Sequence, residues 1–168
     1  LQKINGPNLR DFINNKKIIR SNLKIKFMNQ LVSIFNFLHN CNPPIIYRDL
    51  KAENILVENN NIFLTDFGLS KFYPENENFK MTGNTGTLRY MAPEVFNKKN
   101  YNLKADIYSL GMILYFIFKG QLPFNEMNRQ MVIDYMENDK NMLVDLNDNF
   151  IKKIIEKCID KNINNRHD

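Results

Sequence analysis

Apolar residues recur every three or four positions over residues 21–40, which is the spacing of a helix with one buried face. Ser21 can cap the start of this helix, and Pro43 and Pro44 favour its end near Asn40. We therefore expect an amphipathic helix whose buried face consists of Ile25, Met28, Leu31, Val32, Phe35 and Leu38.

The second half of the chain predicts two more helices. Residues 105–118, ADIYSLGMILYFIF, are apolar nearly all round, which is typical of a helix buried on every side, and Gly120 is a suitable stop. A last helix begins near Asn147 or Asp148 and turns one face inward, made of Phe150, Ile151, Ile154, Ile155, Cys158 and Ile159. The domain is therefore expected to be mainly helical, with residues 105–118 at its centre.

The middle of the chain shows a different pattern. Residues 54–57 and 62–66 are short β-prone runs separated by the turn-rich sequence ENNN, which predicts a small hairpin. Residues 67–94 contain glycines and prolines and no sustained periodicity. We expect a long exposed segment there, of a length that is usually functional or disordered in a compact domain.

Composition narrows the class of protein. The chain has 168 residues, 43% hydrophobic and 24% charged, as expected for one soluble globular domain. Its net charge of +5 comes from Lys and Arg scattered among Asp and Glu, so we expect a mixed solvated surface and no nucleic-acid partner. The longest wholly apolar run, residues 112–118, is too short to span a membrane. Cys41 and Cys158 are expected to be reduced thiols of a cytoplasmic protein, although the sequence leaves a disulfide open.

A cluster of charged residues interrupts two apolar runs in residues 45–57, IIYRDLKAENILV. Asp49, Lys51 and Asn54 project from this loop, and the predicted hairpin returns the chain so that Asp66 comes close. The oxygens of Asn54 and Asp66 suit Mg²⁺, while Asp49 is left to accept a proton from a hydroxyl. Lys51 supplies the positive charge that phosphoryl transfer needs. The loop therefore indicates phosphoryl-transfer chemistry.

Five motifs follow one another in the order and spacing of the large C-terminal lobe of protein kinases, which the whole chain resembles. They are YRDLKAEN, DFG (66–68), GTLRYMAPE (86–94), DIYSLG (106–111) and a closing Arg166. The resemblance implies an α+β, protein-kinase-like fold, mainly α-helical, with a small β-hairpin at the catalytic site and without the N-terminal β lobe. It divides this partial kinase domain into a hinge-like segment (1–5), the catalytic loop (45–57), the activation segment (66–94) and the central helix (105–118).

The resemblance also assigns roles to individual residues. Asp49 is the catalytic base, Lys51 steadies the γ-phosphate of ATP, and the Thr87 hydroxyl bridges the two. Asn54 and Asp66 hold Mg²⁺. The residues that it places around ATP are Leu1, Gln2, Lys3, Ile4, Leu9, Lys51, Glu53, Asn54, Leu56 and Asp66, with Leu9 and Leu56 as the adenine floor.

Further residues have structural roles by the same resemblance. Glu94 and Arg166 form a buried ion pair, and Asp106 holds the backbone of the catalytic loop. Tyr47 stands where the family usually has His, and its ring stacks beneath Phe67. From its place at the end of a helix, His39 is interpreted as a packing or capping residue.

The activation segment suggests regulation by phosphorylation. Arg48, next to the base, resembles the residue that a phosphate recruits in kinases whose activation loop is ordered in this way. Thr82 and Thr85 are the candidate sites, modified by an upstream kinase or by autophosphorylation in trans. Lys51 and Thr87 resemble serine/threonine kinases, and MTGNTGTLRYMAPEV most resembles their tyrosine-kinase-like group.

Two functions of different class follow. The first is an ATP-dependent protein kinase that phosphorylates Ser and Thr hydroxyls of protein substrates in signal transduction. The glycine loop, strand Lys and helix Glu of the small lobe are missing from the sequence, and the chain begins at Leu1 without Met. We therefore expect a fragment that has negligible turnover alone. The alternative is a truncated pseudokinase that acts as a protein-binding module.

Overall fold

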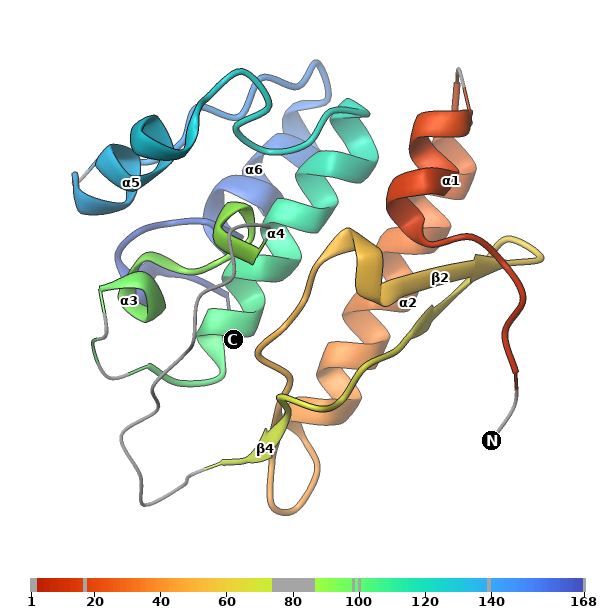
Figure 1. Cartoon of the computed structure of the whole chain (residues 1–168), viewed down its shortest axis with the longest axis horizontal. Helices are drawn as coiled ribbons and strands as arrows, with labels where there is room; N and C mark the ends of the chain where they lie inside the picture. Colours follow the sequence, from red (N-terminus) through yellow and green to blue (C-terminus); the bar gives the residue numbers. More distant parts are fainter. Residues whose placement is uncertain are drawn as a thin grey trace.

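Helices are the main regular elements of the described chain, and a short hairpin lies against one of them (Figure 1). The computed structural model describes residues 3–16, 18–73, 87–97, 99, 101–138 and 140–167. The longest elements are α2 (Ser21–His39), α4 (Lys104–Lys119) and α6 (Asn149–Cys158). The shorter elements are α1 (Leu9–Asn15), β1 (Ile45–Ile46), β2 (Ile55–Glu58), β3 (Asn61–Leu64), β4 (Lys71–Phe72), α3 (Pro93–Phe96) and α5 (Arg129–Glu137), with 3₁₀ turns at Ala52–Asn54, Thr87–Arg89 and Ile163–Asn165. This arrangement confirms the mainly helical fold with a small hairpin that the sequence predicts.

The core is built around α4, as its nearly continuous apolar sequence predicts. The helix packs against α2 and, more extensively, against α6. Gly111 allows the close approach of α6, because a Cβ at this position would lie 2.6 Å from the Cβ of Cys158. Gly120 ends the helix with a φ of 77°, the left-handed conformation that glycine adopts without strain. Cys158 is buried in this contact, and both it and Cys41 are free thiols.

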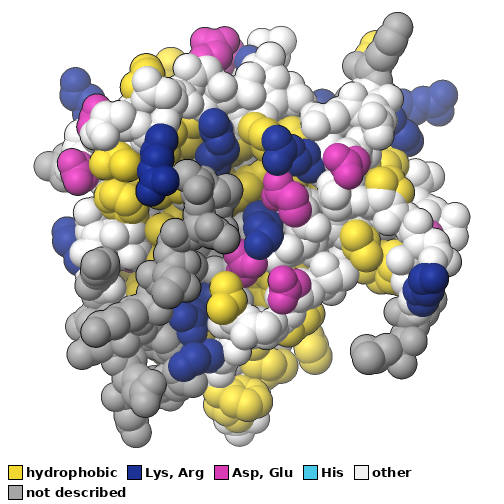
Figure 2. All heavy atoms as spheres, viewed as in Figure 1, with side chains coloured by type: hydrophobic (Ala, Val, Ile, Leu, Met, Phe, Trp, Pro, Cys, Tyr) yellow, Lys and Arg dark blue, Asp and Glu magenta, His cyan; other side chains and the backbone are white. Residues whose placement is uncertain are grey.

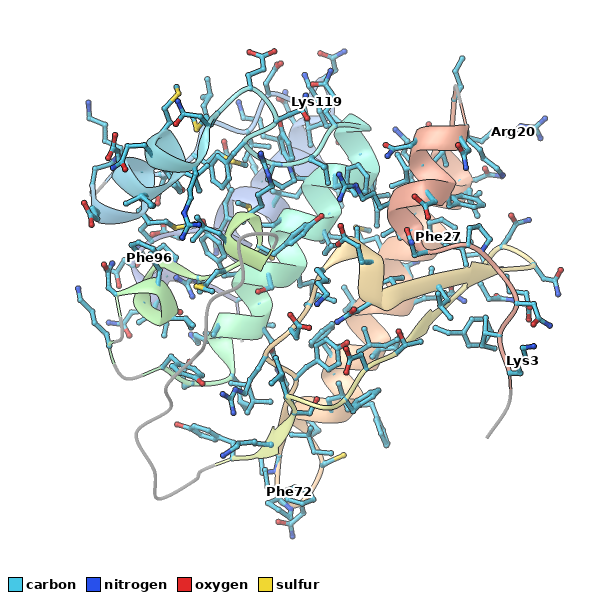
Figure 3. The ribbon with its side chains drawn as sticks, in the orientation of Figure 1. Lys3, Arg20, Phe27, Phe72, Phe96 and Lys119 are labelled. Atoms are coloured by element: carbon cyan, nitrogen blue, oxygen red, sulfur yellow. The ribbon has the colours of Figure 1, made fainter. Side chains whose placement is uncertain are left out.

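The bounds of α2 agree with the prediction, but its buried face is rotated. Ile25 and Val32 are 37% and 48% exposed, whereas Phe27, which the periodicity did not select, is fully buried. The cause is α1, an unpredicted helix whose Phe12 ring lies 5.7 Å from that of Phe27 (Figure 3). Ser21 does not cap the helix either: it is the first helical residue and follows Arg20, whose side chain makes no capping bond.

The hairpin forms with the predicted pairing. Strands β2 and β3 are antiparallel, with Ile55 opposite Leu64. Asn59 and Asn60 have φ values of 51° and 58°, so the connection is a two-residue turn of the type that matches the twist of a hairpin. The hairpin lies against α2 through β3.

The other edge of the hairpin is covered by the start of the chain. The amide of Val57 donates a 2.8 Å hydrogen bond to the carbonyl of Pro7. Gly6 is required for this approach, since a Cβ there would lie 1.9 Å from the carbonyl oxygen of Val57. Strand β4 pairs with β1, with Ile45 opposite Phe72, and the sequence predicted neither of these strands.

Helix α6 begins as predicted and differs in one residue of its face. The Asp148 carboxylate caps it by accepting hydrogen bonds from the amides of Phe150 and Ile151, at 2.9 and 3.1 Å. Ile151, Ile155 and Cys158 are buried, but Phe150 is 71% exposed. It lies in the first turn, where the Asp148 cap fixes the backbone and the Phe150 side chain faces solvent. Helix α5, which the sequence analysis did not identify, is capped in the same way by Asn128.

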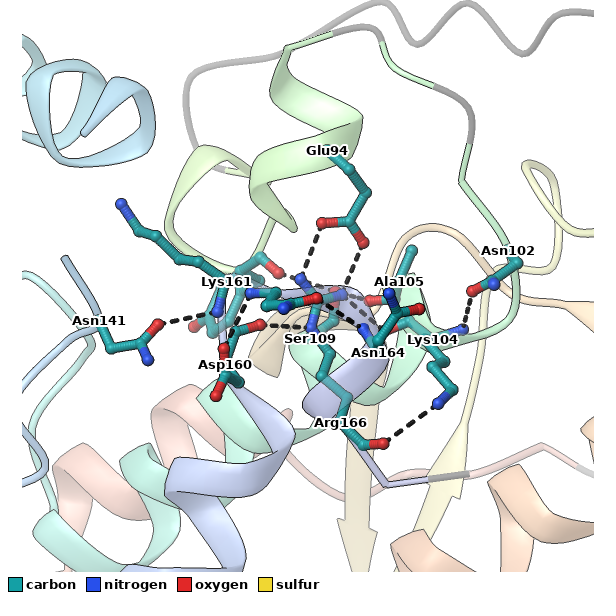
Figure 4. A network of polar contacts seen from close by, with 12 residues as sticks. Glu94, Asn102, Lys104, Ala105, Ser109, Asn141, Asp160, Lys161, Asn164 and Arg166 are labelled. Atoms are coloured by element: carbon teal, nitrogen blue, oxygen red, sulfur yellow. Dashed lines mark hydrogen bonds and ion pairs between the residues drawn. The ribbon is translucent and has the colours of Figure 1, made fainter. Parts of the chain in front are cut away.

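A buried ion pair ties the end of the chain to α3 (Figure 4). The Arg166 guanidinium binds the Glu94 carboxylate through two parallel hydrogen bonds of 2.6 and 2.8 Å, as predicted. Its remaining donors reach the carbonyls of Asp160, at 2.6 Å, and Lys104, at 3.1 Å. The Arg166 side chain has no exposed surface, so the pair holds α3, the start of α4 and the C-terminal turn together.

Replacing Arg166 by Met should lower the free energy of unfolding by about 3 to 5 kcal/mol, because the Glu94 carboxylate is left buried without its partner. Urea denaturation measures this loss. The control is Lys152→Gln, which breaks a surface pair of 3.8 Å with Glu156 and should cost less than about 0.5 kcal/mol. Equal losses in the two variants would contradict the role given to the buried pair.

Candidate active site

The loop between β1 and β2 is held from below by one carboxylate of α4. Asp106 is 1% exposed and accepts hydrogen bonds from the amides of Tyr47 and Arg48, at 2.7 and 2.9 Å. Nε2 of His39, the last residue of α2, lies 3.1 Å from the same carboxylate. Arg48 has a φ of 74°, a left-handed conformation that is strained for a residue with a side chain. The predicted role of Asp106 is confirmed, and His39 has a structural position.

Three residues of this loop form one compact polar group. Oδ2 of Asp49 accepts hydrogen bonds from Nζ of Lys51, at 2.6 Å, and from Nδ2 of Asn54, at 3.0 Å. The same Nδ2 also donates to the backbone carbonyl of Asp49, at 2.9 Å. Asp49 is 5% exposed, and among the described residues none donates to its other oxygen, Oδ1. The Asp49 carboxylate is thus held through one oxygen, and its second oxygen accepts no hydrogen bond from the described residues.

The hairpin brings Asp66 next to this group. The amide and hydroxyl of Thr65 donate to the carbonyl of Asn54, at 2.9 and 3.1 Å, so Asp66 follows directly after the residue paired with Asn54. Asp66 is exposed and has a φ of 58°. Its Oδ1 accepts a 3.2 Å hydrogen bond from the amide of Gly68. The pairing of β2 with β3 therefore brings Asp66 close to the loop that carries Asp49, as the sequence predicts.

An aromatic pair supports the connection from β3 to β4. Tyr47 is fully buried, and its hydroxyl donates to the carbonyl of Thr65. Its ring contacts that of Phe67 with centroids 5.2 Å apart and planes at 77°. The expected contact is present, but it is edge-to-face and not a parallel stack. Burial raises the pKa of the Tyr47 hydroxyl well above its usual value, so this group stays protonated and acts as a donor.

The expected nucleotide-binding residues differ in how much surface they present. Leu56 is half-buried, and Leu9 beneath it has no exposed surface, so Leu56 is the one of the pair that a ligand can touch. Lys3 is exposed and Ile4 half-buried. Glu53 forms a 2.8 Å ion pair with Arg10 of α1.

Neither Arg10 nor the helix that carries it was predicted from the sequence. A signal was present: Asn8 caps α1 by accepting from the amide of Asp11 at 2.9 Å, and Leu9, Phe12 and Ile13 follow with helical spacing. Several residues with predicted functional roles lie outside the part of the chain that the structure describes. These are Leu1 and Gln2, the candidate phosphorylation sites Thr82 and Thr85, and the side chain of Thr87.

The charges of the site fit a magnesium nucleotide. Acidic and basic side chains are intermixed in the middle of the face shown in Figure 2, over the loop between β1 and β2. The Asn54 amide nitrogen donates to Asp49, so the Asn54 oxygen and the exposed carboxylate of Asp66 are suited to the predicted role of metal ligands. No group of three or more His, Cys, Asp or Glu side chains suited to a metal occurs among the described residues. Mg²⁺ does not need one, since it is usually held by one or two carboxylates, waters and substrate phosphates.

Comparison with known proteins agrees with this geometry. The protein kinase domain family matches residues 1–168. A probable serine/threonine-protein kinase of Dictyostelium discoideum is 40% identical over 123 residues, which are 71% of this chain and 12% of that protein. The serine/threonine-protein kinase VIK of Arabidopsis thaliana is 37% identical over 127 residues, or 72% of this chain and 29% of that protein.

A third relative covers almost the whole chain. The CBL-interacting serine/threonine-protein kinase 20 of Arabidopsis thaliana is 31% identical over 169 residues, or 99% of this chain and 38% of that protein. The chain thus spans well under half the length of these relatives. No helix among the described residues has the length and hydrophobicity of a membrane span. The tyrosine-kinase-like group stays a prediction.

The loop that places Asp49 beside Lys51 and Asn54, the adjoining DFG sequence and the match over residues 1–168 lead to one conclusion. This chain belongs to the protein kinase family, and the relatives named above are serine/threonine kinases.

Proposed function

We propose that this chain is the catalytic lobe of an ATP-dependent kinase that phosphorylates Ser and Thr side chains of protein substrates in signal transduction. The observation that supports this best is that the two oxygens of the Asp49 carboxylate differ in their hydrogen bonds. Oδ2 is occupied by Lys51 and Asn54, and Oδ1 has no donor among the described residues. An acceptor held in this way is suited to a substrate hydroxyl.

In the proposed reaction, Oδ1 of Asp49 accepts the proton of the substrate hydroxyl as its oxygen attacks the γ-phosphorus of ATP. The bond from that phosphorus to the bridging oxygen breaks, and ADP leaves. Lys51, 2.6 Å from Asp49, stabilises the negative charge on the transferred group. Leu56 offers apolar surface to the adenine, and the start of the chain reaches the same strand where Asn8 bridges to Leu56. Lys3 and Ile4, a few residues earlier, stay predicted nucleotide contacts.

Asn54 and Asp66 would hold Mg²⁺. The ion supplies charge neutralisation between the phosphates when it is bound. The chain's own part is to keep the two oxygen ligands together, which it does through the hydrogen bonds from Thr65 to the carbonyl of Asn54. Phosphorylation of Thr82 or Thr85 and a cytoplasmic location stay predictions.

Replacing Asp49 by Asn in the full-length protein should lower the rate of phosphate transfer by about 10² to 10⁴, the usual contribution of a general base. Transfer of radiolabelled phosphate from ATP to Ser/Thr peptides measures the change. The matched control is Asp134→Asn on the exposed side of α5, which should leave the rate unchanged. Equal rates for the wild-type protein and the Asp49 variant would refute the assignment of the base.

Replacing Asp66 by Asn should raise the Mg²⁺ concentration needed for half-maximal activity by about tenfold or more, because a charged ligand is lost. A magnesium titration of the same transfer assay measures this shift. Asp145→Asn, which removes an exposed carboxylate paired with Lys119, serves as the control. An unchanged magnesium dependence in the Asp66 variant would argue against its role as a metal ligand.

A further inference from the structure

The positive charge of the chain is concentrated in one segment. Between Asp11 and Asp49 the sequence contains five Lys or Arg residues before Arg48 and no Asp or Glu. The rest of the chain has as many acidic as basic residues, so residues 12–47 carry the whole net charge of +5. The even distribution that the sequence analysis described therefore does not hold for this part. Figure 2 shows basic side chains at the upper right, over the end of α1 and the start of α2.

Three of these cations line an open hollow of about 420 Å³ at the start of α2. They are Lys16, Arg20 and Lys26, and Figure 3 shows Arg20 at the edge of the molecule. Ile18, which is 85% exposed, lines the same hollow. In the part of the chain that the structure describes, no acidic side chain forms an ion pair with any of the three. The ammonium of Lys16 lies over the Phe12 ring, 4.2 Å from its centroid, so the charges of all three cations lack an acidic partner in this part of the chain.

A second open hollow of about 600 Å³ continues from the first along α2 and β3, and the two share Asn22 and Lys26. Its apolar lining includes Ile25, a residue that the helical periodicity places in the core and that is 37% exposed here. Gln30 of α2 holds β3 beside this hollow: its side chain accepts from the amide of Ile62 at 3.3 Å and donates to the side chain of Asn61 at 3.0 Å. Together the two hollows therefore make one continuous shallow groove, with a basic end at the start of α2 and an apolar end at Ile25.

We propose that these two hollows form a docking groove for an extended acidic peptide of a partner protein. Asp or Glu side chains of the peptide contact Lys16, Arg20 and Lys26, and a Leu, Ile or Phe side chain of the peptide contacts Ile25. Charge complementarity supports this choice of partner, since the described lining of the two hollows contains three cations and no Asp or Glu, which favours an acidic ligand. The apolar end gives such a peptide a place to bury a side chain, as recognition grooves do.

The shape of the surface favours a peptide over other anionic partners. The two hollows are shallow and follow one another along α2, with cations at one end and apolar side chains at the other, an arrangement that fits an elongated ligand with an acidic and an apolar part. A nucleic acid is bound mainly through many phosphate contacts, and the groove has three described cations followed by an apolar end.

The groove is separate from the residues proposed for phosphoryl transfer. It begins at the first turn of α2, and the other end of this helix, at His39, contacts Asp106 beneath the catalytic loop. Eighteen helical steps separate Ser21 from His39, which is about 27 Å. A docked peptide would leave Asp49 accessible, so binding can be tested whether or not the chain transfers phosphate.

The test is fluorescence anisotropy of the full-length protein with a set of labelled peptides in which Asp and Glu flank one Leu, Ile or Phe at varied spacings. We expect members of this set to bind, and copies with Lys at each acidic position not to bind. The double variant Arg20→Glu/Lys26→Glu should weaken binding by at least about tenfold at low salt. Lys153→Glu, the same charge reversal at an exposed position of α6, should leave affinity unchanged.

A second pair of variants tests the apolar end without changing charge. Ile25→Asn should weaken binding, whereas Val32→Asn, at an exposed position of α2 outside both hollows, should not. The proposal is overturned if no acidic peptide binds, if the Lys copies bind equally well, or if the Arg20/Lys26 variant keeps full affinity. Binding to phosphatidylserine vesicles in place of every peptide would identify a membrane surface and would also overturn it.

Discussion

The catalytic loop depends on one buried carboxylate, that of Asp106. It accepts two backbone amides of the loop, and it does so where Arg48 has a left-handed conformation that costs about 1 to 3 kcal/mol. An apolar residue in its place would leave both amides unpaired in the interior, at about 1 to 3 kcal/mol each. Because Asp106 belongs to the central helix α4, the position of the loop is set by the most buried element of the molecule.

The remaining polar groups of the site are connected by hydrogen bonds to one another. Asn54 contacts Asp49 through its side chain and Thr65 through its carbonyl, so a single residue joins Asp49 to the end of the hairpin. The Tyr47 hydroxyl adds a second link, from the loop to the carbonyl of Thr65. Such a network is stable only when its members are satisfied together. The exposed Asp66 is therefore positioned by residues that are themselves buried or half-buried.

Long periodic segments were predictable from sequence, and contacts between distant segments were not. The bounds of α2, α4 and α6 follow from local patterns. The buried face of α2 does not, because Phe27 is covered by α1, a helix of only seven residues. Strands β1 and β4 have two residues each, and they are strands only because the chain returns to pair them. Neither pattern nor propensity can identify an element of that length.

The same distinction applies to the site. Residue chemistry and spacing identified Asp49, Lys51, Asn54 and Asp66 as a group, and the predicted ion pair of Glu94 with Arg166 is present. Sequence could not tell which oxygen of Asp49 is occupied, because this depends on side-chain rotamers in the folded loop. Nor could it pair Glu53 with Arg10, which are 43 residues apart and meet only because α1 packs beside the 3₁₀ turn that contains Glu53.

The close contact of α4 with α6 at Gly111 has a chemical consequence for the thiol enclosed there. Burial raises the pKa of Cys158 to about 12, so at neutral pH only about one molecule in 10⁵ carries the reactive thiolate. Oxidants and alkylating reagents act on that form. The close approach that Gly111 permits thus buries the Cys158 thiol and makes it unreactive. The hydrophobic centre of the lobe is thereby protected from redox change.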